Sequence, residues 1–155
     1  MSLPSLPGTY VLVIEVTCRL MIEGPFNEFI PEGIYIYAGS ALGPGGLRAR
    51  ITRHFSSRKK VRWHIDYLTG KVPPLLAVYT IHPGKFECAL VKSLLKEGFS
   101  PVLEGFGASD CREGCPSHLL RWPGSIQECI EGIFNAFTSL GLNPVLYERG
   151  NKKYY

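Results

Sequence analysis

The sequence predicts a small mixed α/β domain of the α+β type, in which a small antiparallel three-stranded central sheet is flanked by helices and followed by a C-terminal extension. Three apolar, β-rich runs are separated by turn signals, and segments with helical spacing lie between and after them. A length of 155 residues suits one domain. We expect an N-terminal tail at 1–7, a core at 8–98, and an extension at 99–155 that packs on the core.

Three segments have the composition of strands. Gly8–Val16 comes first, and its period of two places alternate side chains on one face. Ile34–Ala38 is the second strand and the natural antiparallel neighbour of the first. The polar stretch 19–33 between them carries Pro and Gly and is expected to be a strand remnant and a loop. Leu75–Ile81 is the third strand.

Four segments have the spacing or the boundary signals of helices. A glycine-rich turn precedes the first of them. The last has Ser125 as its N-cap and Glu128 at its third helical position, which is the pattern of a capping box. The helices are expected at Leu47–Phe55, Arg62–Leu68, Phe86–Lys96 and Ile126–Leu140. Within the extension, Leu119–Trp122 is expected to be a short strand.

The composition is that of an ordinary globular protein, with 45% hydrophobic and 19% charged residues. No apolar run approaches the ~20 residues of a membrane-spanning helix, and the first residues do not have the pattern of a secretory signal. We therefore expect a cytoplasmic protein that does not enter the membrane. Five cysteines, an odd number spread along the chain, argue against a disulfide framework and for reduced thiols.

The net charge is only +4, but positive charge is concentrated between residues 48 and 62. That stretch contains seven Lys or Arg residues and no acidic residue, and it interleaves with Phe55 and Trp63. It is either a solvated basic face or a surface that follows a phosphate backbone. The candidate nucleic-acid-binding residues are Arg48, Arg53, His54, Arg58, Lys59, Lys60 and Arg62.

Three short motifs occur in a fixed order along the first half of the chain. Gly8-Thr9-Tyr10 opens the first strand, Tyr37-Ala38-Gly39 closes the second, and Leu47-x-x-Arg50 lies on the helix that follows. In this order the motifs resemble the GIY-YIG nuclease superfamily, over roughly residues 8–98. The resemblance implies a nuclease fold with two tyrosines on adjacent strands and an arginine on the next helix.

The second half carries another resemblance. The segments 105–111 (Gly-Phe-Gly-Ala-Ser-Asp-Cys) and 115–119 (Cys-Pro-Ser-His-Leu) are similar to a branch of that superfamily called domain of unknown function 123. Members of the branch occur alone or fused to DNA glycosylases of the endonuclease III type. By this analogy a DNA glycosylase-like protein is a candidate partner, besides DNA or RNA.

The resemblance assigns roles to seven residues. It implies catalytic roles for Tyr10, Tyr37, Arg50 and His64, motif glycines at Gly8 and Gly39, and a divalent metal ligand at Glu87. The family's metal glutamate aligns with Val91, and Glu87 lies four residues earlier, about 6 Å along a helix axis.

These residue types suit phosphodiester hydrolysis. A lone carboxylate can hold Mg²⁺ or Mn²⁺ when waters and a substrate phosphate complete the shell. The arginine fork matches phosphate geometry. A tyrosine hydroxyl, with a pKa of about 10, needs a metal, arginine or histidine neighbour to act as a base, and His64 is the expected helper. The expected function is a metal-dependent endonuclease acting on DNA in repair or recombination.

The alternative is a non-catalytic module that binds nucleic acid with the same scaffold and basic face. Val91 at the family's glutamate position favours this alternative. It predicts salt-sensitive binding without cleavage.

A second candidate metal site lies in the extension. Cys111, Cys115 and His118 are residue types that bind zinc, and Asp110, Cys88 or Cys129 is a conceivable fourth ligand. Because the run supplies three ligands without a second ligand pair elsewhere in the chain, we do not expect zinc, and buried thiols or a local disulfide are the alternatives. A zinc-dependent or redox-active protein is the third functional reading.

Overall fold

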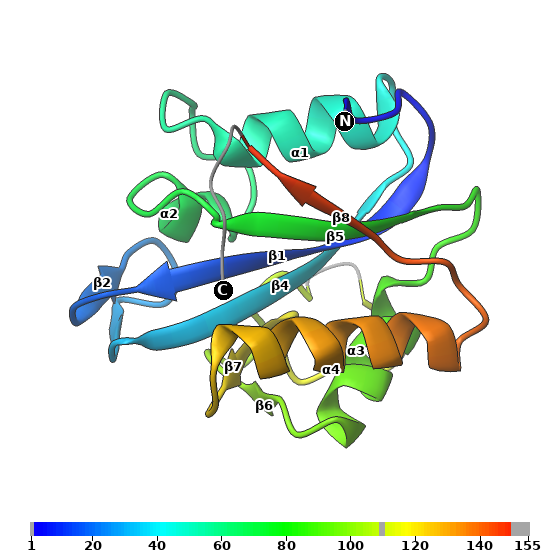
Figure 1. Cartoon of the computed structure of the whole chain (residues 1–155). Helices are drawn as coiled ribbons and strands as arrows, with labels where there is room; N and C mark the ends of the chain where they lie inside the picture. Colours follow the sequence, from blue (N-terminus) through cyan, green and yellow to red (C-terminus); the bar gives the residue numbers. More distant parts are fainter. Residues whose placement is uncertain (1, 109–110, 150–155) are drawn as a thin grey trace.

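The computed structural model describes residues 2–108 and 111–149. Its helices are α1 (Gly46–Phe55), α2 (Asp66–Thr69), α3 (Glu87–Lys96) and α4 (Ile126–Ser139). Its strands are β1 (Gly8–Val16), β2 (Leu20–Ile22), β3 (Glu28–Ile30), β4 (Gly33–Ala41), β5 (Leu76–Ile81), β6 (Ser100–Pro101), β7 (Leu119–Trp122) and β8 (Val145–Glu148). The mixed α+β class is as predicted, and Figure 1 shows the sheet between two layers of helices.

The central sheet has six strands, so the prediction of a small three-stranded sheet is wrong. The order is β6-β7-β4-β1-β5-β8, and all neighbouring pairs are antiparallel. The predicted pairing of the first two strands is present, with Tyr10 opposite Gly39 and Leu12 opposite Tyr37.

The three additional strands all come from residues that follow α3. A three-stranded sheet would leave the outer edges of β4 and β5 with unpaired backbone groups. Instead, β7 pairs with β4 and β8 pairs with β5, while β6 pairs with β7. The residues of the predicted extension therefore complete the sheet on both sides. The prediction of a short strand at Leu119–Trp122 is confirmed by β7, whereas β6 and β8, with two and four residues, are too short for an alternating pattern to identify them.

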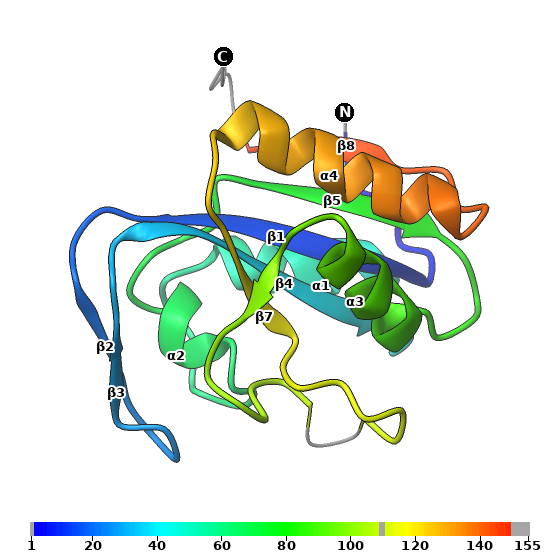
Figure 2. The same ribbon diagram turned by 90° about the horizontal axis from the view of Figure 1, so that it is seen from below.

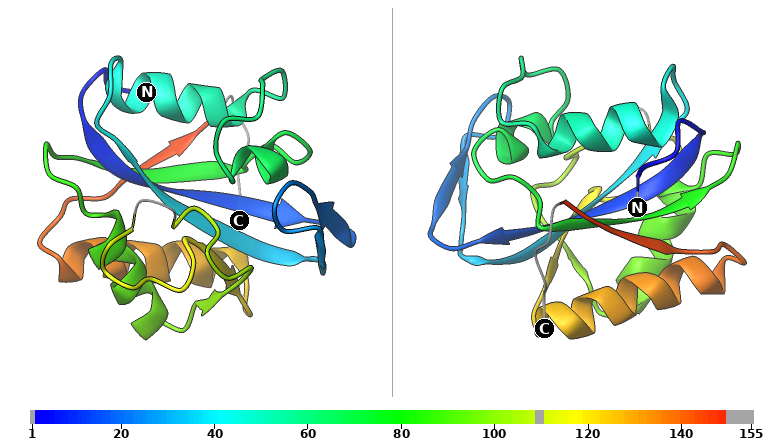
Figure 3. Two further views of the ribbon diagram at one scale, coloured as in Figure 1. Left: turned by 180° about the vertical axis from the view of Figure 1, so that it is seen from behind. Right: turned by 45° about the horizontal axis from the view of Figure 1, so that its top comes forward.

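Two other segments differ from expectation. The stretch 19–33, predicted as a strand remnant and a loop, contains two short strands, β2 and β3, in an antiparallel hairpin that projects beyond the sheet where β1 ends (Figure 3). The helix predicted at Arg62–Leu68 is shorter, because Asp66 accepts hydrogen bonds from the backbone N–H groups of Arg62 and Trp63 and holds them in a turn before α2.

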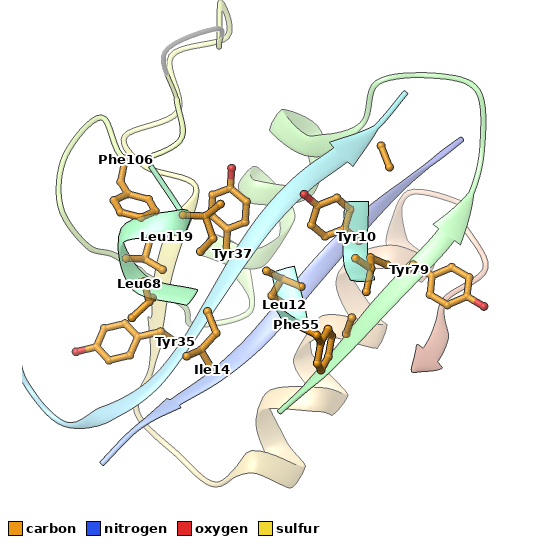
Figure 4. Packing of buried hydrophobic residues seen from close by; sticks show 14 of the residues in the cluster. Tyr10, Leu12, Ile14, Tyr35, Tyr37, Phe55, Leu68, Tyr79, Phe106 and Leu119 are labelled. Atoms are coloured by element: carbon orange, nitrogen blue, oxygen red, sulfur yellow. The ribbon is translucent and has the colours of Figure 1, made fainter. Parts of the chain in front are cut away.

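The alternation of side chains in the central strands divides the core into two parts. Tyr10, Leu12 and Ile14 of β1 face α1 and α2, in a cluster shown in Figure 4. Val11 and Val13 face the opposite side, where they belong to the cluster that includes α3 and α4. Figure 2 shows these two helices covering that face of the sheet.

The last helix begins as the sequence predicts. The Ser125 side chain accepts a hydrogen bond from the Glu128 N–H, and the Glu128 side chain accepts one from the Ser125 N–H, so that the capping box is complete. In the part of the chain that the structure describes, no helix combines the length and the apolar character that crossing a membrane requires.

Candidate functional site

An open cleft of about 460 Å³ lies beside the first residues of β1 and the last residues of β4. All five residues with a predicted catalytic or magnesium-binding role line it together: Tyr10, Tyr37, Arg50, His64 and Glu87. They come from β1, β4, α1, the segment before α2, and the start of α3. The fold therefore brings together, in one cleft, side chains that lie far apart in the sequence of the predicted core.

The two tyrosines lie on neighbouring strands and on the same face of the sheet (Figure 4). At both motif glycines the structure leaves no room for a side chain. A Cβ on Gly39 would lie 2.5 Å from the Tyr10 hydroxyl, and a Cβ on Gly8 would collide with the carbonyl oxygen of Thr80. The absence of a side chain at Gly39 thus leaves room for the Tyr10 hydroxyl at the wall of the cleft.

The Tyr10 hydroxyl is hydrogen bonded to His54. Tyr10 Oη and His54 Nε2 are 2.6 Å apart, and both side chains are buried. The sequence predicts His54 on the nucleic-acid-binding surface. It is instead fully buried, because α1 turns this residue toward β1. The signal that could have revealed its role is its position four residues after Arg50, on the same side of the helix.

Burial controls the protonation of this pair. Desolvation, reinforced by Tyr37, raises the pKa of Tyr10 well above its usual value despite the opposing charge of Arg50. Desolvation and the charge of Glu87 likewise raise the pKa of Tyr37. Desolvation, together with the positive charge of Lys59, lowers the pKa of His54 to about 3. At neutral pH the cleft therefore contains two neutral phenols and a neutral imidazole.

Arg50 is held with its guanidinium group at the cleft. One Nη group donates to the carbonyl oxygen of Ser40 over 3.1 Å, and Cζ lies 4.1 Å from the ring centre of Trp63. The sequence analysis assigned Trp63 no role beyond its place in the basic run. Stacking on Trp63 fixes the plane of the guanidinium group while its remaining donors stay available.

Glu87 is the first residue of α3, and its carboxylate lines the cleft with 13% of the side chain exposed. Lys85 Nζ lies 3.4 Å from one carboxylate oxygen. Val91, one turn later, is completely buried in the core beneath α3. Of these two positions, only Glu87 reaches the cleft, so its carboxylate is the one that could bind a divalent cation there.

His64 lines the cleft but is bound to its wall. Its Nδ1 accepts a hydrogen bond of 2.8 Å from the N–H of Gly107, and its ring packs edge-on against Phe26. Partial burial lowers its pKa. The ring is therefore held by the loop before β7, and the expected contact with Tyr10 is made by His54 instead.

The basic run from 48 to 62 divides into structural and exposed residues. Arg53 forms a two-point ion pair with the buried carboxylate of Asp66, and Lys59 Nζ donates to the Thr69 hydroxyl and to two carbonyl oxygens at the end of α1. Arg48 Nε donates to the carbonyl oxygen of Leu3. The remaining members of the run are exposed: Arg58, Lys60 and Arg62.

A second group of side chains lies beside the cleft. The ligand atoms of Cys88, Cys111, Cys115 and His118 all lie within 4.8 Å of one another and could hold a metal ion. Three thiols and an imidazole favour zinc over Mg²⁺ or Mn²⁺, contrary to the expectation of no zinc. Of the conceivable fourth ligands, Cys88 is the one whose sulfur lies with the other three ligand atoms. Cys129 lies in the core beneath α4, and Asp110 falls outside the described residues.

The cysteines of this group differ in acidity. Burial raises the pKa of the Cys111 thiol, but hydrogen bonds from the Cys88 thiol and from the backbone of Cys115 outweigh it and lower the pKa to about 6. Burial raises the pKa of Cys88, and the hydrogen bond to Cys111 adds to this effect. The sequence gives Cys88 no special signal, because it lies 23 residues before Cys111 on a different element.

Comparison with known protein families identifies the family of the chain. No curated protein and no solved structure matches the chain. The family described as "Domain of unknown function DUF123" matches residues 9–139, which include every residue of the cleft and of the cysteine group. The chain therefore belongs to the DUF123 family.

Proposed function

We propose that this protein is a metal-dependent endonuclease of the GIY-YIG superfamily that hydrolyses phosphodiester bonds in DNA, in a repair or recombination setting. One observation carries the proposal. A hydrogen-bonded tyrosine and histidine, an oriented arginine and a carboxylate converge on one open cleft. DNA is favoured over RNA because proteins of the resembling branch occur fused to DNA glycosylases.

Arg50 is suited to bind the scissile phosphate. Its guanidinium group is oriented by Trp63 and Ser40, so a phosphate that enters the cleft meets a preformed fork of donors. The exposed side chains of Arg58, Lys60 and Arg62 extend positive charge outward from the cleft. They are suited to follow the backbone of the bound strand.

The pair of Tyr10 and His54 is suited to activate water. A water molecule gives a proton to Tyr10 Oη while Tyr10 passes its own proton to His54 Nε2, and the resulting hydroxide attacks phosphorus. The bond to the leaving oxygen then breaks, that oxygen takes a proton from solvent water, and His54 returns its proton to solvent through Tyr10. Tyr10 never carries a full negative charge, which agrees with its raised pKa. Burial is the main cause of the low pKa of His54, and a bound phosphate offsets the smaller contribution of the neighbouring positive charges.

Glu87 would hold the divalent cation. A single, partly exposed carboxylate at an open cleft fits Mg²⁺ or Mn²⁺, which retain several waters and take further ligands from a phosphate. When bound, the ion neutralises charge that develops on the phosphate oxygens. Lys85 has to release the carboxylate for this to happen. Tyr37, with its protonated hydroxyl in the same cleft, would orient water or phosphate by hydrogen bonding.

The proposal is tested with supercoiled plasmid, branched DNA and RNA, with Mg²⁺ or Mn²⁺ added or omitted. We expect DNA nicking that depends on the added ion and that falls by orders of magnitude in Tyr10→Phe, Arg50→Ala and Glu87→Gln. The added ion is withheld rather than chelated, so that a tightly bound zinc ion is not removed at the same time.

Two conservative variants serve as controls. Tyr79→Phe removes a hydroxyl from the residue opposite Tyr10 on β5, and Glu97→Gln neutralises an exposed carboxylate at the end of α3. Both should cut like the wild type. Cutting by Arg50→Ala at the wild-type rate would refute the assigned site. Salt-sensitive binding without cutting under any metal would refute the enzyme and favour the non-catalytic nucleic-acid-binding module.

A further inference from the structure

The group of Cys88, Cys111, Cys115 and His118 is independent of the proposed hydrolysis, since none of its thiols is needed for the steps at the cleft. Cys88 lies in the first turn of α3, and the other three residues lie between β6 and β7. Cys88 and His118 are buried, and Cys111 and Cys115 are half-buried. Four such groups seldom converge without a common partner, because each thiol and imidazole loses solvation.

The distances suit a small tetrahedral ion. Two thiolates bound to one zinc ion at about 2.3 Å lie about 3.8 Å apart in a tetrahedron. Cys88 Sγ lies 3.8 Å from His118 Nε2, and all pairs of ligand atoms lie within 4.8 Å. The shorter distance of 2.9 Å between the sulfurs of Cys88 and Cys111 requires one sulfur to move by about 1 Å. Cys111 is on a loop and can make that movement.

A disulfide explains the group less well. Joining Cys88 to Cys111 would leave Cys115 and His118 directed at the same point without a partner. The position of His118 is also fixed from two sides, because its backbone N–H donates to the Phe106 carbonyl and its own carbonyl accepts from Ala38 of β4. Binding of one ion by all four groups explains why the His118 imidazole is held beside the three thiols.

We infer that Cys88, Cys111, Cys115 and His118 bind one zinc ion, which fastens the loop between β6 and β7 to the start of α3. Four protein ligands close the coordination shell, so that the ion is structural rather than a site for substrate. The same loop carries Gly107, whose N–H binds His64 and whose Cα packs so closely that a Cβ would lie 2.7 Å from the Tyr37 ring. Glu87 directly precedes Cys88. The ion therefore holds one wall of the cleft in place.

The test uses the full chain, purified under reducing conditions without chelator. Inductively coupled plasma mass spectrometry should find about one zinc ion per chain. After removal of the zinc, titration with Co²⁺ should give the strong visible absorption of a tetrahedral site and the thiolate charge-transfer band. Cys88→Ser and Cys115→Ser should each weaken Co²⁺ binding by more than about 100-fold. Cys18→Ser removes an exposed thiol far from the group and should bind like the wild type.

A second measurement follows the loop without relying on the variants. In the wild-type chain, removal of the ion should expose the segment between β6 and β7 to limited proteolysis, and added Zn²⁺ should restore its protection. The inference is overturned if the wild-type chain gives no tetrahedral Co²⁺ spectrum, or if Cys115→Ser binds as tightly as the wild type. A disulfide between Cys88 and Cys111 in the reduced preparation, found by peptide mapping, would overturn it as well.

Discussion

The phenolic oxygen of Tyr10 lies 2.6 Å from Nε2 of His54, although the two residues are 44 positions apart and both are buried. The contact joins β1 to α1 at the wall of the cleft. It satisfies two buried polar groups, and in the proposed hydrolysis it is also the route of the proton.

Tyr10→Phe tests the structural role of this contact. The variant leaves Nε2 of a buried histidine without a partner, so we expect the free energy of unfolding to fall by about 1–3 kcal/mol. Urea unfolding of the purified chain measures the change. Tyr79→Phe, at the opposite position of β5, is the matched control and should cost less. Equal losses in the two variants would mean that the Tyr10 hydroxyl contributes no more than an ordinary strand tyrosine.

The lowered pKa of His54 predicts a pH dependence of stability. In the unfolded chain an unperturbed histidine binds a proton below about pH 6.5, whereas in the folded chain the pKa of His54 is about 3. Between these values the unfolded state holds more protons, so stability falls as the pH falls, by at most about 1.4 kcal/mol per pH unit. His54→Gln removes this contribution.

Thermal unfolding between pH 4 and pH 7 measures the effect. The loss of stability on acidification should be shallower in His54→Gln than in the wild type. Acidic groups such as Asp66, whose pKa is lowered, despite burial, by hydrogen bonds from Arg53 and from the backbone, contribute equally in both proteins, so the difference between the two slopes isolates His54. Parallel curves would show that His54 is protonated in the folded protein.

Gly39→Ala tests the space reserved for Tyr10. The new Cβ would lie 2.5 Å from the Tyr10 hydroxyl, which is held by its hydrogen bond to His54, so we expect a loss of about 1–3 kcal/mol in unfolding free energy. Gly43→Ala is the control, since a Cβ there meets no atom within 4 Å. The ring resonances of Tyr10 and His54 in NMR spectra should shift in Gly39→Ala alone. A Gly39→Ala variant as stable as Gly43→Ala would refute the steric reason for this glycine.

Arg53→Ala tests the division of the basic run. Its removal leaves the buried carboxylate of Asp66 with backbone donors only, so we expect a loss of about 2–4 kcal/mol in stability. Arg58→Ala changes an exposed residue and should alter stability by less than about 0.5 kcal/mol while weakening DNA binding at low salt. Chemical unfolding and a salt series of binding assays separate the two effects. Equal stability of the two variants would place Arg53 on the exposed surface instead.

Local patterns in the chain were sufficient for the elements that form around the cleft. Alternation identifies β1 and the centre of β4, apolar spacing identifies α1 and α3, and the capping box identifies the start of α4. Each of these signals depends on residues within one element, where neighbouring side chains and backbone dihedral angles decide the outcome. The shared face of Tyr10 and Tyr37 follows from this alternation only once the register places Tyr37 opposite Leu12.

The contacts between elements needed the folded chain. Short strands such as β6 and β8 have no recognisable sequence pattern. They form because they pair with the otherwise open edges of β7 and β5. The hydrogen bond of His54 to Tyr10 and the approach of Cys88 to Cys111 depend on how helices pack on the sheet. Local spacing could only suggest roles for Arg50 and Glu87, and it is the fold that brings both side chains to one cleft. Packing between residues far apart in sequence decides such contacts, and no local propensity encodes it.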